Sequence, residues 1–178
     1  QILDEALEKL DAQSAYLKIN FKYFIDKIAP ISKRKSVLDL DCSFIANKMQ
    51  GDHIEFTMAV NVPFTSLCPC SKEISKYGAH NQRGLMRVKI KFGSDQQSIS
   101  IEDLAAIMEQ QASCPIYPLL KREDEKYVTE TAYENPKFVE DILRDLVIAL
   151  RQIKGVSWFS IECENYESIH NHSAYASH

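Results

Sequence analysis

Two strand-like runs of the sequence are joined by the stretch 63-PFTSLCPCSKEISKYGAHNQRG-84. It contains two thiols, a histidine, two lysines and an arginine. Cys68 and Cys70 are separated only by Pro69, so a disulfide between them would close a very small, strained ring. A thiolate and an imidazole are both good ligands for a borderline metal such as zinc. The stretch therefore predicts part of a metal site, although a Cys-Pro-Cys pair alone would be weak evidence.

Length and composition indicate a compact globular protein. The chain has 178 residues, of which 45% are hydrophobic and 26% charged, as in average folded proteins. This length predicts one domain or two small ones. The formal net charge of -4, with both signs interspersed, provides no basic field for a nucleic-acid backbone, so we expect no nucleic-acid partner.

The sequence also predicts a cytoplasmic protein with reduced thiols. No apolar run reaches the roughly 18 residues that span a bilayer, and the first residues do not resemble a signal peptide. We therefore expect no membrane partner. The five cysteines are an odd number, which suits free thiols better than a secreted disulfide framework.

Apolar residues alternate with polar ones, the period typical of strands, in five segments. These are residues 17–23, 37–46, 54–62, 86–92 and 156–164. Gln50, Gly51 and Asp52 predict a hairpin turn between the second and third segments, and residues 93–95 are expected to end the fourth.

Helical spacing of apolar residues predicts three helices. The first covers residues 2–10 and the second residues 101–112, with Ser100 as its N-terminal cap. For the third we expect Asn135 as the cap, Pro136 at the first helical position and an apolar face that reaches Leu150. The tail, residues 165–178, has no apolar period and is expected to be irregular.

The order of these elements predicts an antiparallel α+β fold. The strands are connected by hairpins rather than by strand–helix–strand crossovers. The two longer helices should cover one face of the sheet. The opposite face should carry the basic residues Arg87, Lys89 and Lys91.

The candidate functional residues are thiols, imidazoles and carboxylates that several elements would have to bring together. They are Cys68, Cys70 and His80 of the central stretch, His170 and His172 of the tail, and the carboxylates Glu123, Glu125 and Glu140. Simpler interpretations remain open. The His170–His172 segment is typical of a solvated tail, residues 121–126 of a solvated charge run, and Glu140 of a surface ion pair with Lys137 or Arg144. Cys42 and Cys163 are expected to be buried, inert thiols, and His53 and His178 to be exposed.

Five long motifs resemble one known family. They are residues 66–72, 77–83, 119–122 with 124–130, 133–141 and 167–172. Together they are similar to GTP cyclohydrolase type IB, and the resemblance runs nearly from end to end. It implies the tunnelling fold (T-fold), in which antiparallel sheets backed by paired helices assemble across subunits into a barrel with active sites at the interfaces. A homotetramer is then expected, with residues 1–34 as the remainder of a first T-fold module and 35–178 as the second.

The resemblance also implies an activity and a site. The activity is hydrolytic opening of the guanine imidazole ring of GTP, which releases formate and gives 7,8-dihydroneopterin triphosphate for folate synthesis. The implied cofactor is a divalent metal ion (Mn, Zn or Fe), held by Cys68, His80 and Glu125. Glu140 would accept hydrogen bonds from guanine, and His170 would transfer protons beside the ring, with Cys70 in the same site. From their charge or place in the motifs, further substrate contacts are expected from Lys72, Arg83, Lys121, Arg122 and His172.

Two other interpretations stand beside this one. A related cyclohydrolase opens the same ring but yields a dihydroneopterin cyclic phosphate. From a different class, the chain would be a non-catalytic metal-binding interaction module, which predicts a closed site with four protein ligands.

Overall fold

The computed structural model describes residues 1–93 and 98–178 and contains one antiparallel sheet. Its seven strands follow the order β1-β2-β3-β4-β6-β7, and β5 pairs with β3. The strands are β1 (Ser14–Ile28), β2 (Lys35–Met49), β3 (Glu55–Leu67), β4 (Asn81–Phe92), β5 (Cys114–Pro115), β6 (Val156–Asn165) and β7 (Ala174–Ser177). The predicted antiparallel α+β class is confirmed. The turn expected at residues 93–95 lies partly outside the described residues.

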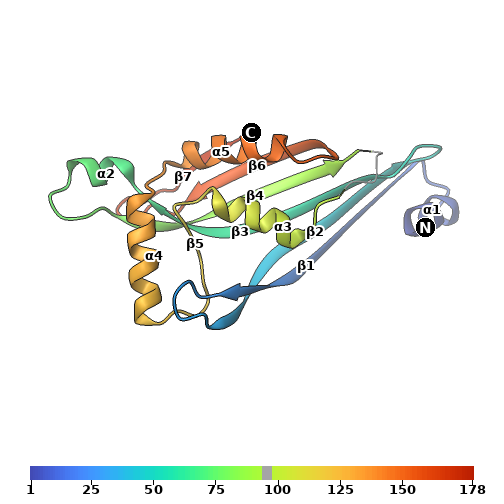
Figure 1. Cartoon of the computed structure of the whole chain (residues 1–178). Helices are drawn as coiled ribbons and strands as arrows, with labels where there is room; N and C mark the ends of the chain where they lie inside the picture. Colours follow the sequence, from blue (N-terminus) through green and yellow to red (C-terminus); the bar gives the residue numbers. More distant parts are fainter. Residues whose placement is uncertain (94–97) are drawn as a thin grey trace.

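Five helices accompany the sheet in the described part of the chain. They are α1 (Ile2–Lys9), α2 (Pro69–Ile74), α3 (Ile101–Gln110), α4 (Arg122–Glu134) and α5 (Val139–Arg151). Figure 1 shows α3 and α5 on the same face of the sheet, while α4 crosses one end and α2 projects beyond that end. None of these helices is long and apolar enough to cross a membrane.

The core lies between the sheet and α3 and α5. Alternate residues of the central strands point into it, because successive side chains of a strand face opposite sides. They meet the apolar faces of the two helices, and the fully buried members include Val60, Val62, Met86, Val88, Ile90, Leu104, Met108, Ile142 and Leu146. The strand and helix periods of the sequence therefore identified the correct faces.

The opposite face of the sheet is polar, and its charges are largely paired. Arg87 contacts Glu164 (2.9 Å) and Lys91 contacts Glu55 (3.0 Å). At the other side of the sheet, Lys22 contacts both Asp39 (2.9 Å) and Asp41 (2.8 Å). The expected basic face is therefore a face of alternating charges rather than a positive patch.

Several elements differ from the sequence expectations. The third predicted helix starts later, at Val139, because Asn135 ends the preceding helix α4 and Pro136 lies between the two helices. A residue before proline is disfavoured in the helical region, so Pro136 separates the helices instead of opening one. The charge run at 121–126 is the start of α4, the tail contains β7, and part of the central stretch is α2.

The two expected modules share one sheet. β1, from residues 1–34, pairs with β2 along its whole length, from Ser14 opposite Met49 to Ile28 opposite Lys35. The division at residue 34 therefore falls within a hairpin, and it stays a prediction.

Candidate metal and substrate site

Cys68 and His80 lie at the base of a projecting segment, residues 68–80, which we call the arm. β3 ends at Leu67, and Cys68 is the N-terminal cap of α2, with Pro69 at the first helical position. The Cys68 Sγ accepts a hydrogen bond from the Ser71 N–H (3.4 Å), and the Cys68 N–H donates to the His80 carbonyl (3.1 Å). The backbones of the two predicted ligands are thus held side by side, where the arm leaves the sheet (Figure 1).

Ser71 closes the base of the arm. Its hydroxyl donates to the Cys68 carbonyl (3.1 Å) and accepts from the His80 N–H (3.2 Å). Both bonds are to backbone groups, so they fix the path of the chain and leave the two functional side chains available. The arm therefore starts and ends at one cross-linked point.

A series of hydrogen bonds begins at the imidazole of His80. Its Nδ1 lies 2.8 Å from Oε1 of Gln82, and the Nε2 of Gln82 donates to Oε1 of Glu167 (3.4 Å). Gln82 is buried on β4, and Glu167 belongs to the connection between β6 and β7. This connection also carries His170 and His172, whose exposed rings stack with centroids 5.1 Å apart.

The start of α5 is tied to the same end of the sheet. The Lys137 N–H donates to the Leu67 carbonyl (3.1 Å), and the Ser66 hydroxyl donates to the Lys137 carbonyl (3.1 Å). Buried Asn165 donates to the Ser66 Oγ (3.1 Å). These bonds join the ends of β3 and β6 to the segment before α5. They hold that segment to Leu67, the residue before Cys68. Exposed Glu140 lies in the first turn of the helix that follows.

The surface-pair interpretation of Glu140 is not borne out. Arg144 contacts Asp141 (2.9 Å), and Lys137 contacts Asp145 (2.8 Å). Among the described residues, no ion pair includes Glu140. Its carboxylate is exposed and available to a ligand.

The α4 segment carries three further candidates, all exposed: Lys121, Arg122 and Glu125. Their neighbour Asp124 is buried and accepts four hydrogen bonds, from Ile31 N–H, Ser32 N–H, Ser32 Oγ–H and Lys121 N–H. Burial by itself raises the pKa of Asp124, but the bonds from Ser32, Lys121 and Ile31 outweigh it, and the pKa lies below its ordinary value. Asp124 thus fastens the start of α4 to the turn between β1 and β2.

A single chain does not bring all predicted metal ligands together. In the residues that the structure describes, no three histidine, cysteine, aspartate or glutamate side chains gather as a possible metal site. Tyr133, at the far end of α4, accepts a hydrogen bond from Lys72 of the arm and lies under its ammonium group, 4.3 Å from the ring centroid. Glu125 is two helical turns earlier, about 12 Å along the axis. Cys68 and His80 are thus paired through their backbones, whereas in the described residues the Glu125 side chain does not complete a three-residue ligand cluster with them.

The remaining candidates differ in exposure. Cys70 is exposed on α2, and Arg83 is exposed on β4, where it pairs with Thr65. Cys42 and Cys163 are buried, as expected, and so is Cys114. His53 and His178 are exposed, which confirms that expectation.

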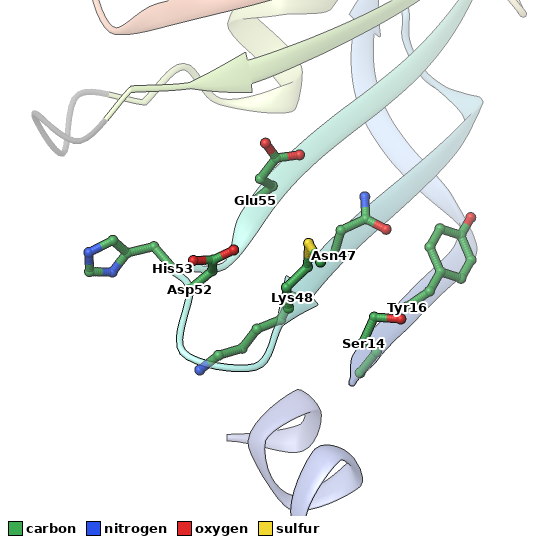
Figure 2. A pocket seen from close by; sticks show the side chains of 9 residues that line it. Ser14, Tyr16, Asn47, Lys48, Asp52, His53 and Glu55 are labelled. Atoms are coloured by element: carbon green, nitrogen blue, oxygen red, sulfur yellow. The ribbon is translucent and has the colours of Figure 1, made fainter. Parts of the chain in front are cut away.

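A cavity of about 550 Å³ lies elsewhere, among the ends of β1, β2 and β3. Figure 2 shows its lining side chains, with Tyr16 and His53 on opposite sides. None of the predicted site residues lines this cavity, and Figure 1 places that end of the sheet opposite the arm. The candidate site residues therefore do not lie at this cavity.

Comparison with known proteins identifies the family. A sequence model described as "Type I GTP cyclohydrolase folE2" matches residues 1–176. The chain belongs to the type I GTP cyclohydrolase FolE2 family. The GTP cyclohydrolase FolE2 of Citrifermentans bemidjiense is 53% identical over 175 residues, which are 98% of this chain and 64% of that protein.

Two other FolE2 proteins are similar to this chain to about the same extent. The protein of Thermosipho africanus is 51% identical over 175 residues, and that of Magnetococcus marinus is 49% identical over 176 residues. These matches cover 98% and 99% of this chain, but 66% and 65% of the respective relatives. The chain thus spans somewhat less than two thirds of the length of the FolE2 proteins it matches.

Sequence reasoning missed the residues that hold the candidate site together. Ser71, Gln82 and Glu167 all lie inside the motifs, but no role was predicted for them. A usable signal existed for Gln82, which follows His80 by two positions and therefore points to the same side of an extended chain. Asp124 had no such signal, because its partners Ile31 and Ser32 are distant in the sequence.

Proposed function

We propose that this chain is part of a GTP cyclohydrolase I, which opens the imidazole ring of GTP to give 7,8-dihydroneopterin triphosphate and formate. The observation that carries the proposal is the hydrogen-bonded base of the arm. There Cys68, His80 and the connection that bears His170 meet at one end of the sheet. Membership of the FolE2 family supports the same reaction.

The donors at the base of the arm suit a divalent metal ion such as Mn, Zn or Fe. Cys68 offers a sulfur atom and His80 an imidazole nitrogen, and both are common donors to such metals. Glu125 is proposed as the third ligand. Cys68, His80 and Glu125 would hold the metal, which would act as a Lewis acid that activates water for hydrolysis of the guanine imidazole ring at C8.

The other residues are proposed to bind GTP and move protons. Glu140 would accept hydrogen bonds from the N1–H and amino group of guanine, since a carboxylate is an acceptor with two suitably spaced oxygens. His170 would donate and accept protons beside the opening ring, and Cys70 lies in the same site. The further substrate contacts are assigned to Lys72, Arg83, Lys121, Arg122 and His172.

We propose that the site is completed between subunits of a homotetramer with the T-fold barrel, and that the protein is cytoplasmic. Two features support assembly. The arm exposes 84% of both Ile74 and Tyr77, an unusual amount for large apolar side chains. The long strand β1 lies at one edge of the sheet, and an open edge of this length normally finds a partner strand. The separation of Glu125 from Cys68 and His80 in one chain also agrees with a shared site.

The direct test is to incubate the metal-loaded protein with GTP and follow formate release and pterin fluorescence. Formate together with a linear dihydroneopterin triphosphate is expected. A cyclic phosphate product would instead favour the related cyclohydrolase. Tight metal binding without turnover would favour the non-catalytic module.

Cys68 and Cys70, separated by one residue, give a matched pair of variants. Cys68→Ala should lose both bound metal and turnover, because it removes the sulfur of the residue whose backbone is bonded to His80 at the base of the arm. Cys70→Ala should keep stoichiometric metal, because Cys70 is exposed and Cys68, His80 and Glu125 remain as the proposed ligands. The metal content of the two variants after dialysis is the measurement. If Cys70→Ala loses its metal and Cys68→Ala keeps it, Cys70 is the ligand instead of Cys68.

A further inference from the structure

A buried amide separates His80 from Glu167. The Gln82 side chain belongs to a residue that is only 7% exposed, so its oxygen and its nitrogen both need hydrogen-bond partners within the protein. Its oxygen faces the ring of His80 at 2.8 Å, and its nitrogen faces the carboxylate of Glu167 at 3.4 Å. No role in the proposed reaction has yet been assigned to Gln82 or Glu167.

The donors and acceptors of this chain allow only one arrangement. An ionised carboxylate can only accept hydrogen bonds, so Glu167 requires the NH₂ side of the Gln82 amide. The amide oxygen must then face His80. Because that oxygen can only accept, Nδ1 of the imidazole must carry the proton.

We propose that Glu167 and Gln82 are positioning residues that fix the tautomer of His80, so that Nδ1 is protonated and the lone pair on Nε2 is free to bind the metal. The inference rests on the proposed metal site. A ligating histidine usually donates its other ring N–H to an oxygen acceptor, which orients the ring and selects the tautomer. Here the acceptor is itself oriented by a second residue.

Glu167 and His170 belong to the same connection between two strands. Glu167 lies in the connection between β6 and β7, which is held to β4 by the bond from the Tyr166 N–H to the Arg83 carbonyl (2.9 Å). His170 follows three residues later in the same connection. The orientation of the metal ligand therefore depends on the placement of the segment that carries the proposed proton-transfer residue.

The first measurement is made on metal-free protein. Long-range ¹H–¹⁵N correlation spectra of the neutral ring distinguish the two tautomers, and the wild type should show His80 as the Nδ1–H form. In Glu167→Ala the amide of Gln82 is free to turn, so the Nε2–H form should gain population. Zn²⁺ titrated alone into the same variant should bind about 10- to 100-fold more weakly, the usual loss when the partner of a ligating residue is removed.

Exchanging the side chains of positions 82 and 167 tests whether the tautomer and the Zn²⁺ affinity can be restored. In the double variant Gln82→Glu with Glu167→Gln, the carboxylate at position 82 accepts from both the His80 Nδ1–H and the new amide at position 167. The Nδ1–H form and most of the Zn²⁺ affinity should therefore return. Glu134→Ala, which removes an exposed glutamate at the end of α4, serves as the matched control and should change neither readout.

The outcomes separate this inference from the proposed function. An unchanged tautomer and unchanged Zn²⁺ affinity in Glu167→Ala would overturn the positioning role. Loss of affinity that the double variant does not restore would also overturn it, because a general structural defect would then explain the loss. If His80→Ala keeps its metal, the proposed metal site fails, while the tautomer spectra still report on the hydrogen-bonded chain itself.

Discussion

The arm, residues 68–80, and the β5–α4 segment, residues 114–134, both carry predicted site residues, but they are held in different ways. The β5–α4 segment is fastened at its middle by Asp124, which accepts three hydrogen bonds from the turn between β1 and β2 and a fourth from the Lys121 N–H. The arm is fastened near its base by the hydrogen bonds of Ser71 and by the contact of Lys72 with Tyr133 of α4. Its tip exposes Ile74 and Tyr77. In both regions the residue that holds the chain is a neighbour of the candidate ligand, not the ligand itself. Positioning and chemistry are thus divided between different residues of the same segment.

Thiol chemistry should show the largest difference between the two regions. Burial raises the pKa of Cys114 to about 11, so on the order of one thiol in 1,000 is ionised at about pH 8. Cys70 on the arm is exposed. In metal-free protein at this pH, iodoacetamide should modify Cys70 at least about 100-fold faster than Cys114, since the thiolate is the nucleophile.

Peptide mapping of the labelled protein checks this order, and Cys70→Ser should remove the fastest phase. Cys42 and Cys163 should also react slowly, because burial raises their pKa values to about 11 and about 12. Equal rates at Cys70 and Cys114 would show that the β5–α4 segment opens as readily as the arm.

Removal of Asp124 should cause a larger loss of folding stability than any single substitution in the arm. Asp124→Ala leaves three backbone N–H groups without their acceptor, so the melting temperature should fall, whereas Glu125→Ala, at an exposed position, should leave it nearly unchanged. The pKa of Asp124 is lower in the folded than in the unfolded chain, so its contribution is complete above the ordinary aspartate value and is lost as pH falls toward the folded value.

The melting temperatures of wild type and Asp124→Ala should therefore stay apart down to about pH 4 and converge progressively as the pH falls below that value. Asp124→Asn, which keeps one acceptor oxygen, should lie between them. A difference that stays constant as the pH falls would mean that the carboxylate charge does not hold α4.

The sequence predicted the sheet and the helices that cover it, because their apolar residues repeat over long segments. Leu104 and Leu146 lie on helix faces with a clear period, and both are fully buried. It missed α4, whose buried residues are only Asp124 and Ala132, so this helix has no apolar stripe to recognise. It missed β7 because four residues are too few to establish a strand period.

The candidate site could be predicted by residue type but not by arrangement. Cys68 and His80 stood out as ligands, whereas the bonds that join them run through Ser71 and Gln82, two residue types that are common on any surface. The cap of α5 was misassigned to Asn135, since Asn is a favoured cap residue and Phe138 is not. The physical cap is the Asp141 carboxylate, which accepts from the Phe138 N–H (3.0 Å).

Ser71 should have a smaller, local effect. Ser71→Ala removes two hydrogen bonds at the base of the arm, and a net cost of about 1 kcal/mol in the free energy of unfolding is expected. Ser75→Ala is the matched control, because its hydroxyl only accepts from the Tyr77 N–H at the exposed tip. Hydrogen exchange should speed up at the His80 amide in Ser71→Ala but not in Ser75→Ala. Faster exchange throughout the sheet would contradict a role limited to the arm.

The tip of the arm should contribute least to folding and most to assembly. Ile74 and Tyr77 contact little within the chain, so replacing both with Ser should change the free energy of unfolding of a subunit by no more than about 0.5 kcal/mol. If the tip packs against another copy, the same double variant should dissociate the oligomer in light scattering, because about 2 kcal/mol or more is lost for each large apolar side chain that is no longer buried. Ile148→Ser, at a position that is 61% exposed on α5, tests whether any exposed apolar residue has this effect. An oligomer that survives the double substitution at the tip, or a wild type that is monomeric, would show that the arm does not mediate assembly.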